Sequence, residues 1–269
     1  MSHICVIIPV HRPDLSDTEK ISLDACYVQL SGFDCFLVHP KNLPITNYLS
    51  VHPHLKSCPV DPEWLSSKNA YNRMKMNPEF YSLFKDYTHF QTYELDSYIF
   101  SPNLYDFTQF DFIGAPIFKG FNNATDKSEI IKGCNSGFSL RNINSCLKVL
   151  EEFPSIQKRW TLFHLLESNL PFLRPWLKSM NWNREKVFQN DHLAAYFKGR
   201  SFHEDMIWSV VVPVLFPNFK VADTVSAYKF SFEINPGLLY KMNDYKLPLG
   251  CHAWPLSTDF WKAHIPGIL

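Results

Sequence analysis

The sequence predicts an α/β protein whose sheet is mostly parallel, and three observations support this fold class. With 269 residues, 46% of them hydrophobic, the chain can bury a substantial core. Its N-terminal part alternates strand-like and helical patterns, and this β-α-β order favours a parallel sheet with helices on its faces. A later strand-like run ends in two carboxylates, Glu94 and Asp96. Because ligands of such sheets bind at the carboxyl ends of the strands, the acidic pair marks the expected binding crevice.

The N-terminal region begins with a strand and a helix. Residues 4–10 form an apolar, largely β-branched run, which is typical of a central strand buried on both faces. Residues 16–19, Ser-Asp-Thr-Glu, match a capping box that starts a helix. The apolar stripe of this helix is expected to contain Ile21, Ala25 and Val28.

The later elements are marked by proline, glycine and asparagine between apolar runs. Further strands are expected over residues 36–39, up to Val60, over 87–93 and over 110–116, with helices around 80–84 and 143–150. Residues 152–200 are aromatic and basic, and they predict helices joined by proline-containing loops. Their aromatic side chains are more typical of a core than of a sugar-binding platform.

Glu94 and Asp96 are the first candidate site residues. Side chains two positions apart on a strand point to the same side, so both carboxylates can reach one ligand. Mg²⁺ and Mn²⁺ take oxygen ligands and are commonly held by one or two carboxylates together with substrate phosphates. The simpler interpretation is that both acids are turn residues at the end of a strand.

Two basic residues precede the acidic strand. Lys68 and Arg73 are the cations that this topology places nearest to a phosphate-bearing ligand in the crevice. The simpler interpretation is a solvated helix face.

Two segments in the middle of the chain have loop-like composition. The asparagine-rich residues 119–128 show no periodicity and could form a lid. Residues 133–141 include Gly133 and Gly137, and such small residues allow the backbone to approach a ligand closely before the next strand. Their spacing is neither a dinucleotide fingerprint nor a P-loop, and an ordinary turn would have a similar composition.

The C-terminal part contains two further candidates. Residues 202–208 place Glu204 and Asp205 ahead of an apolar stretch, where Asp205 is expected to start a buried helix. An acid at a helix N-terminus also has a purely structural explanation, through capping and the helix dipole. His252 follows Gly250 in a loop that lets it point inward, although a single histidine in an apolar loop is more often a structural residue.

Composition excludes several classes of protein. The 26 basic and 26 acidic residues cancel, so no net field attracts nucleic acid. Seven scattered cysteines without a C-x-x-C pair argue against a disulfide framework or a zinc site, and they indicate free thiols in a reducing compartment. The N-terminus lacks a signal-like leader, and the longest apolar run is too short to span a bilayer. We expect a cytoplasmic protein, soluble or peripherally associated with the inner face of the membrane.

The ordered motifs resemble the core of the GT-A glycosyltransferases and, more narrowly, a bacterial glycosyltransferase-like family long labelled a domain of unknown function. The resemblance covers nearly the whole chain, with residues 152–200 the weakest part. It is carried by the N-terminal Ile-Ile-Pro-Val strand, Tyr71-Asn-Arg, Glu94-Leu-Asp96, Ile113-Gly-Ala-Pro, Ser136-Gly-Phe-Ser-Leu-Arg, His203-Glu-Asp205, Lys229-Phe-Ser-Phe-Glu and Gly250-Cys-His-Ala-Trp.

The resemblance implies a Rossmann-like GT-A fold with a nucleotide-sugar crevice. Residues 1–269 would form a single domain, with a nucleotide-sugar-binding half over about 1–115 and an acceptor half plus C-terminal extension over about 116–269. The donor would be a nucleotide-diphosphate sugar and the acceptor a glycan or lipid-linked glycan, as in bacterial surface polysaccharide synthesis. Asp205 matches the catalytic base of inverting members, Asp96 and His252 the ligands of Mn²⁺ or Mg²⁺, and Glu94 the first acid of the D-x-D motif, where this chain has Glu in place of Asp. Pro9, Val10, Lys68 and Arg73 are expected on the donor side, and Gly137 and Glu204 on the acceptor side.

Two other classes of function remain open. A nucleotidyltransferase acting on sugar phosphates would also use paired carboxylates and Mg²⁺, but it would normally have a glycine-rich phosphate loop after the first strand, and Pro9-Val-His-Arg-Pro has no glycine. A non-catalytic carbohydrate-binding protein would agree with the 16% aromatic residues.

Overall fold

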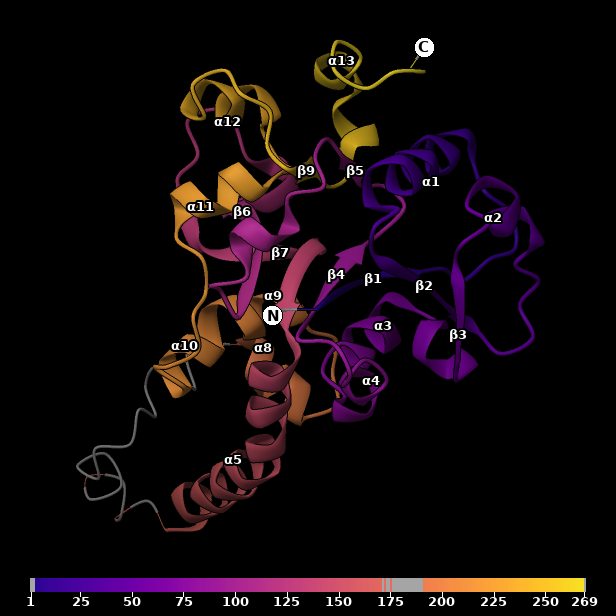
Figure 1. Ribbon diagram of the computed structural model, residues 1–269. Helices are drawn as coiled ribbons and strands as arrows, with labels where there is room; N and C mark the ends of the chain where they lie inside the picture. The colour runs from indigo at the N-terminus through magenta and orange to yellow at the C-terminus, as the bar shows by residue number, and fades with distance from the viewer. Residues whose placement is uncertain (1–2, 171, 173–174, 176–190, 269) are drawn as a thin grey trace.

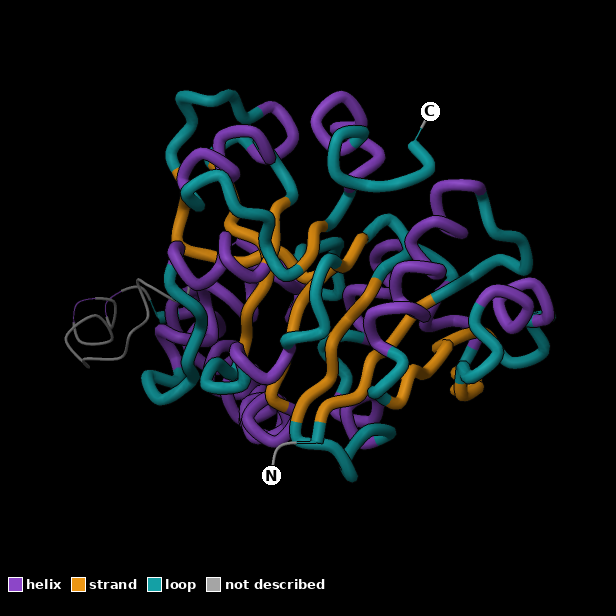
Figure 2. Tube along the Cα trace, turned by 45° about the horizontal axis from the view of Figure 1, so that its top comes forward, coloured by secondary structure: helices purple, strands orange, loops and turns teal. Residues whose placement is uncertain are grey.

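A six-stranded sheet with the order β3-β2-β1-β4-β7-β6 forms the centre of the protein. The computed structural model describes residues 3–170, 172, 175 and 191–268. The strands of this sheet are β1 (Ile4–Pro9), β2 (Asp34–Pro40), β3 (Lys56–Val60), β4 (His89–Tyr93), β6 (Phe112–Phe118) and β7 (Ile130–Asn142). The first four in sequence are parallel, whereas β7 is antiparallel to both β4 and β6. The predicted α/β class with a mostly parallel mixed sheet is confirmed, and Figure 2 shows the strands side by side.

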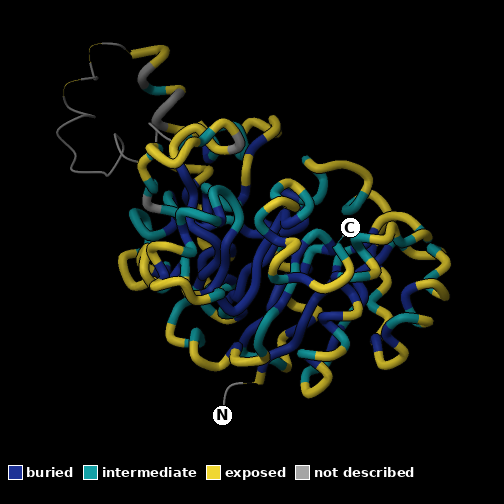
Figure 3. The backbone as a smooth tube through the Cα atoms, turned by 90° about the horizontal axis from the view of Figure 1, so that it is seen from above, coloured by how far each residue is buried: buried dark blue, intermediate teal, exposed yellow. Residues whose placement is uncertain are grey.

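Helices cover both faces of the parallel strands, which explains their apolar composition. In Figure 1, α1 (Asp17–Leu30) and α2 (Thr46–Val51) lie above the sheet, and α3 (Lys68–Met74), α4 (Pro78–Ser82) and α5 (Ile143–Asn169) lie below it. Residues Ile4 to Ile8 of β1 are accordingly all buried. The buried sheet is enclosed by exposed helix surfaces and loops (Figure 3).

Helix α1 begins as predicted, and its buried face agrees with the predicted stripe in part. Ser16 and Glu19 form the expected capping box. Ala25 is buried as expected and Ile21 is half-buried, whereas Val28 is 62% exposed, so its place in the predicted stripe is wrong. The buried face also includes Leu23, Cys26 and Leu30.

The segment 133–141 lies within strand β7 and does not precede a strand as expected. It pairs with β4 on one side and with β6 on the other, and the pairing with β6 is irregular around Pro116. Within this segment, Gly137 has the closest neighbour, because a Cβ there would lie 2.0 Å from the ring nitrogen Nε2 of His252. Gly114 of β6 was not singled out by the sequence, and a Cβ there would lie 1.9 Å from the carbonyl oxygen of Asn135.

A small second sheet, with the order β5-β9-β8, connects the C-terminal region to the acidic segment. It contains β5 (Tyr98–Ile99), β8 (Ser231–Phe232) and β9 (Gly250–Cys251). The C-terminal helices are α8 (Asp191–Phe197), α9 (Glu204–Met206), α10 (Val212–Leu215), α11 (Thr224–Phe230), α12 (Pro236–Met242) and α13 (Thr258–Trp261), with a π-helical turn at Ile207–Val211. Short 3₁₀ turns occur at Pro62–Leu65, Leu104–Phe107, Phe121–Asn123 and Trp254–Ser257. The pairing of β5 with β9 brings residues near 250 beside those near 98.

Three expectations about the whole chain can be compared with the described residues. All seven cysteines are free thiols, as expected. None of the described helices is long and apolar enough to cross a membrane. The helices expected in residues 152–200 include the rest of α5 and α8, while residues 176–190 lie outside the described part of the chain.

Candidate active site

A cavity of about 1000 Å³ opens at the carboxyl ends of β1 and β4. Strand β1 has β2 on one side and β4 on the other, so the chain connections on the two sides of β1 run in opposite directions. Open α/β sheets bind their ligands at such a switch point. Pro9 and Val10 line the cavity from the end of β1, and Glu94 and Asp96 from the end of β4. These four residues lie where the sequence analysis placed them.

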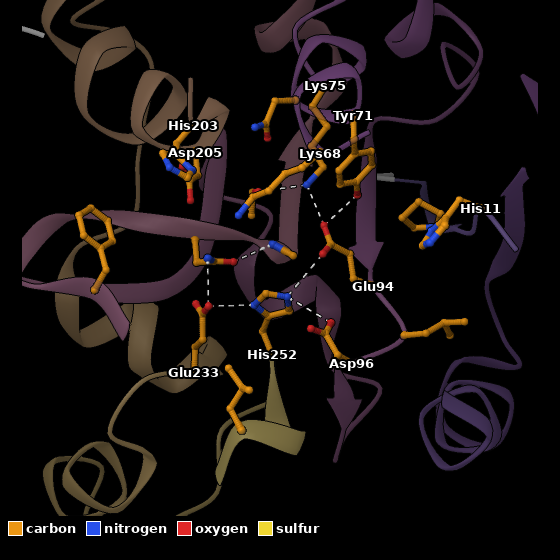
Figure 4. A pocket seen from close by; sticks show the side chains of 18 of the residues that line it. His11, Lys68, Tyr71, Lys75, Glu94, Asp96, His203, Asp205, Glu233 and His252 are labelled. Carbon is orange, nitrogen blue, oxygen red and sulfur yellow. Dashed lines mark hydrogen bonds and ion pairs between the residues drawn. The ribbon is translucent and has the colours of Figure 1, made fainter. Parts of the chain in front are cut away.

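Glu94, Asp96 and His252 converge on one point of the cavity wall (Figure 4). His252 Nε2 lies 3.2 Å from Asp96 Oδ1 and 3.5 Å from Glu94 Oε2. His252 directly follows β9, and its backbone N–H donates to the carbonyl of Phe232 at 2.8 Å. The backbone N–H of Trp254 donates to the Asp96 carbonyl at 3.1 Å, which ties the two segments together. The small sheet therefore positions a residue far along the chain beside the acidic pair.

The imidazole of His252 sits in a fitted position. A Cβ on Gly137 would lie 2.0 Å from His252 Nε2, so only glycine leaves room for the ring. Glu233 Oε1 lies 3.1 Å from Nδ1 on the other side of the ring, and Asn135 Nδ2 donates to the same oxygen at 3.2 Å. Burial alone would lower the pKa of His252, but the carboxylates of Glu233 and Asp96 raise it well above its ordinary value.

The chemistry of this cluster fits a divalent cation. One ligand atom each from Glu94, Asp96 and His252 can lie within 4.8 Å of the others. Asp96 Oδ1 and both ring nitrogens of His252 are buried, and within the described part of the chain none has a partner with hydrogen-bond geometry. Two carboxylates suit Mg²⁺ and Mn²⁺, and the imidazole shifts the preference toward Mn²⁺. Glu94, Asp96 and His252 are thus the residues that could hold the ion, with Glu233 facing the second nitrogen of the histidine.

Helix α3 presents a stripe of side chains to the cavity that the sequence analysis did not identify in full. Lys68, Tyr71 and Asn72 of α3 line it together with Lys75, the C-cap residue, at the spacing i, i+3, i+4, i+7 of a single helix face. Tyr71 Oη donates to Glu94 Oε1 at 2.8 Å, and Lys75 Nζ donates to the same oxygen at 2.9 Å. Helical periodicity counted from Lys68 would have indicated Lys75.

Lys75 controls the charge of Glu94. Only 4% of the Lys75 side chain is exposed, and its Nζ also donates to Ser136 Oγ at 3.1 Å. Burial by itself would raise the pKa of Glu94, but Lys75 first and then His252 hold it well below the ordinary value. Glu94 is therefore a carboxylate at neutral pH.

Asp205 lines the cavity on the side opposite Asp96 (Figure 4). It does not start the helix as expected: α9 begins at Glu204, and the N-cap is His203. Asp205 Oδ1 accepts a hydrogen bond from the neighbouring N–H of Met206, at 2.7 Å. Burial, with a further contribution from the adjacent charge of Glu204, raises the pKa of Asp205 to about 7. A carboxyl group with this pKa can accept a proton at neutral pH, as a general base must.

Two of the expected site residues do not line the cavity. Glu204, expected on the acceptor side, is 1% exposed, and both of its oxygens lie 3.1 Å from Arg141 Nη2. Arg73, expected on the donor side, donates to the Arg200 carbonyl at 3.0 Å and lies over the ring of Phe202. Both are held in structural contacts. Gly137, the other residue expected on the acceptor side, does line the cavity, where it accommodates His252.

The chain matches one protein family and is similar in fold to several solved structures. A family model described as "Protein of unknown function (DUF5672)" matches residues 54–252. No protein of curated function matches the sequence. Among solved structures, mouse xyloside xylosyltransferase 1 superposes with a TM-score of 0.50 at 10% identity, covering 94% of this chain and 98% of that one. At this identity the likeness shows a shared fold, which is the GT-A fold expected from the motifs.

Two further structures are similar at lower scores. The galactosyltransferase LgtC, solved with donor and acceptor sugar analogues, has a TM-score of 0.47 at 11% identity, covering 92% of this chain and 86% of that one. The glycosyltransferase GlyE of Streptococcus pneumoniae has a TM-score of 0.42 at 13% identity, covering 94% of this chain and 54% of that one.

Proposed function

The chain belongs to the family of proteins of unknown function whose model matches residues 54–252, and we propose that it is a metal-dependent glycosyltransferase. It would move a sugar from a nucleotide-diphosphate donor to a hydroxyl of a glycan or lipid-linked glycan, as in the synthesis of a bacterial surface polysaccharide. One observation carries this proposal: Glu94, Asp96 and His252 meet in the crevice of a GT-A fold, with Asp205 on the opposite wall.

The donor side of the cavity suits a diphosphate. A bound Mn²⁺ or Mg²⁺ would neutralise the negative charge that builds on the leaving diphosphate as the anomeric C–O bond breaks. Asp96 and His252, with Glu94, would hold this ion, and Lys68 of the cavity lining would supply a further positive charge. Pro9 and Val10 would contact the nucleotide.

Asp205 is the residue that we assign as base. The acceptor oxygen forms a new bond to the anomeric carbon while its proton passes to the Asp205 carboxylate, and the diphosphate leaves with the electron pair of the broken bond. A base opposite the leaving group favours attack from the far face, so we propose inversion of the anomeric configuration. The pKa of about 7 leaves a substantial fraction of Asp205 ionised at neutral pH.

The proposal is tested by incubating the protein with a panel of nucleotide sugars and Mn²⁺. Slow hydrolysis of one donor, lost in excess chelator and restored by added Mn²⁺, is the expected result. Release of pyrophosphate would indicate a nucleotidyltransferase, and binding without turnover would indicate a carbohydrate-binding protein.

Substitutions in the cluster should reproduce the effect of the chelator. Asp96→Ala and His252→Ala each remove one ligand and should abolish Mn²⁺-dependent donor binding, measured by calorimetry. Asp106→Ala, at an exposed residue outside the cavity, is the matched control. Full activity in chelator, or an Asp96→Ala protein that binds Mn²⁺ and donor like the parent, would contradict the metal role.

A further inference from the structure

A second cluster of metal-binding side chains lies beneath α1, outside the cavity. It contains Cys26 of α1, Cys35 of β2 and His52, the residue that follows α2. The two Sγ atoms and a ring nitrogen of His52 lie within 4.8 Å of one another. The three residues are 0%, 2% and 2% exposed, so the cluster is fully buried.

His52 is the anomaly of this cluster. Both of its ring nitrogens are buried, and neither has a hydrogen-bond partner within the described part of the chain. The ring of Tyr27 packs against the imidazole with centroids 4.9 Å apart, but this contact satisfies neither nitrogen. Leaving a buried polar group without a partner costs about 1–3 kcal/mol, and an unplaced ion is one of the standard explanations for such a group.

We propose that Cys26, Cys35 and His52 bind a thiophilic transition-metal ion, with Zn²⁺ the best candidate. Thiolate and imidazole are the ligands that Zn²⁺ prefers. Two thiolates cancel the charge of a divalent ion, so the complex is neutral, as a buried site requires. Zinc bonds of about 2.3 Å to sulfur and 2.0–2.1 Å to nitrogen would place the ligand atoms about 3.5–3.8 Å apart. Because these atoms already lie within 4.8 Å of one another, each pair needs to approach by at most about 1.3 Å.

The ion would join three elements of the N-terminal region. Helix α1, strand β2 and the end of α2 each supply one ligand, so binding should stabilise their packing. Glu19 of α1 and Tyr48 of α2 line the cavity, which means that the same elements form one wall of the candidate active site. The two metal sites differ in chemistry, because the active-site cluster contains no sulfur and suits a harder ion. This proposal therefore stands apart from the proposed function.

Cobalt titration of the reduced full-length protein tests the site. Co²⁺ bound to thiolate gives near-ultraviolet charge-transfer absorption that a site of carboxylates and imidazole cannot give. We expect this absorption to saturate at one equivalent, to vanish on addition of Zn²⁺, and to persist in the Asp96→Ala protein. Zn²⁺ should also raise the melting temperature, because it binds the folded state.

Variants then identify the ligands. Cys35→Ser should weaken Zn²⁺ binding by more than the roughly 10–100-fold that loss of an outer-shell partner costs. Cys58→Ser, at a half-buried thiol outside the cluster, is the matched control and should bind as the parent does. Absence of thiolate-to-cobalt absorption in the reduced parent protein would overturn the proposal without reliance on any variant. A Cys26–Cys35 disulfide that reductant cannot open would overturn the proposal as well, because its sulfurs could not bind a metal. It would be detected as a mass lower by two hydrogen atoms under non-reducing conditions.

Discussion

At the scale of single residues, two adjacent carboxyl groups have opposite properties. Burial would raise the pKa of Glu204, but Arg141 and Lys75 hold it below its ordinary value. Asp205, one position later, has no ion pair with a cation of the described residues, and burial raises its pKa to about 7. Because their pKa values differ in direction, the two neighbouring acids can have different roles. Glu204 is a permanent charge that organises the structure, and Asp205 is a group that can exchange protons.

Asp205→Asn should separate catalysis from folding. Asparagine preserves the size of the side chain and the contact with the Met206 N–H, so donor affinity should be unchanged while transfer falls about 10²–10⁴-fold. In the parent protein the transfer rate should rise with pH up to about 7, as Asp205 ionises. Donor calorimetry and initial transfer rates measure both effects. Transfer at near the parent rate would remove Asp205 from the role of base.

The same substitution should change the pH dependence of stability. A folded-state pKa raised from 3.8 to about 7 means that the folded protein binds the proton more tightly than the unfolded chain. This stabilisation is fully present below about pH 4 and is lost as the pH rises through 7. At about pH 8, Asp205→Asn should therefore unfold at a higher urea concentration than the parent, and its unfolding free energy should be larger by at most about 4 kcal/mol. Near pH 4 the two proteins should differ little. Equal midpoints at both pH values would show that Asp205 is not destabilised by burial.

At the scale of elements, α3 shows how helix geometry decides which cations reach the cavity. Lys68 and Arg73 are five positions apart, which places them about 140° apart around the helix, so one cavity cannot receive both. Lys75 is seven positions from Lys68 and returns to nearly the same face. The structure accordingly has Lys68 and Lys75 at the cavity and Arg73 against Phe202.

Alanine variants of α3 test this division. Lys68→Ala should raise the KM for donor with a smaller effect on the acceptor KM, because a positive charge near the diphosphate is lost. Arg73→Ala, on the same helix but outside the cavity, is the control and should leave the donor KM unchanged. Steady-state kinetics of both proteins decide the question. An increase in donor KM for Arg73→Ala alone would reverse the assignment.

At the scale of the whole molecule, a buried charge network joins distant parts of the chain. Arg141 of β7 pairs with Glu204 of α9, and Lys75 contacts both Glu204 and Glu94. Arg141 also donates to Tyr81 at 2.9 Å, and its guanidinium is fully buried. The strand, the helices and the sheet edge that carries Glu94 are thus positioned by one set of charges.

Removing one member should cost more than an ordinary core substitution. Glu204→Gln leaves Arg141 with an uncompensated buried charge, and we expect a loss of about 3–5 kcal/mol in unfolding free energy. Because Arg141→Met removes that charge, the double variant should lose less than the sum of the two single variants. Urea unfolding of all four proteins measures the coupling. Additive losses would show that the two residues contribute independently.

Sequence alone determined the features that depend on near neighbours. The strand at residues 4–10, the capping box at Ser16 and the acidic end of β4 were all predictable, because strand periodicity and helix caps involve residues only a few positions apart. The motif order also predicted the GT-A fold and that Glu94, Asp96 and His252 would lie together.

Tertiary structure alone decided which side chains share an environment. Lys75 meets Ser136 across 61 positions, and Arg141 meets Glu204 across 63, so no local pattern could show that Glu204 is buried or that Lys75 faces Glu94. Glu233 and Gly137 flank His252 only because β8 and β7 place them there, and Cys26, Cys35 and His52 converge only because α1 packs over β2. Burial and electrostatic environment depend on distances in space, and the folded chain sets those distances between residues that the sequence leaves far apart.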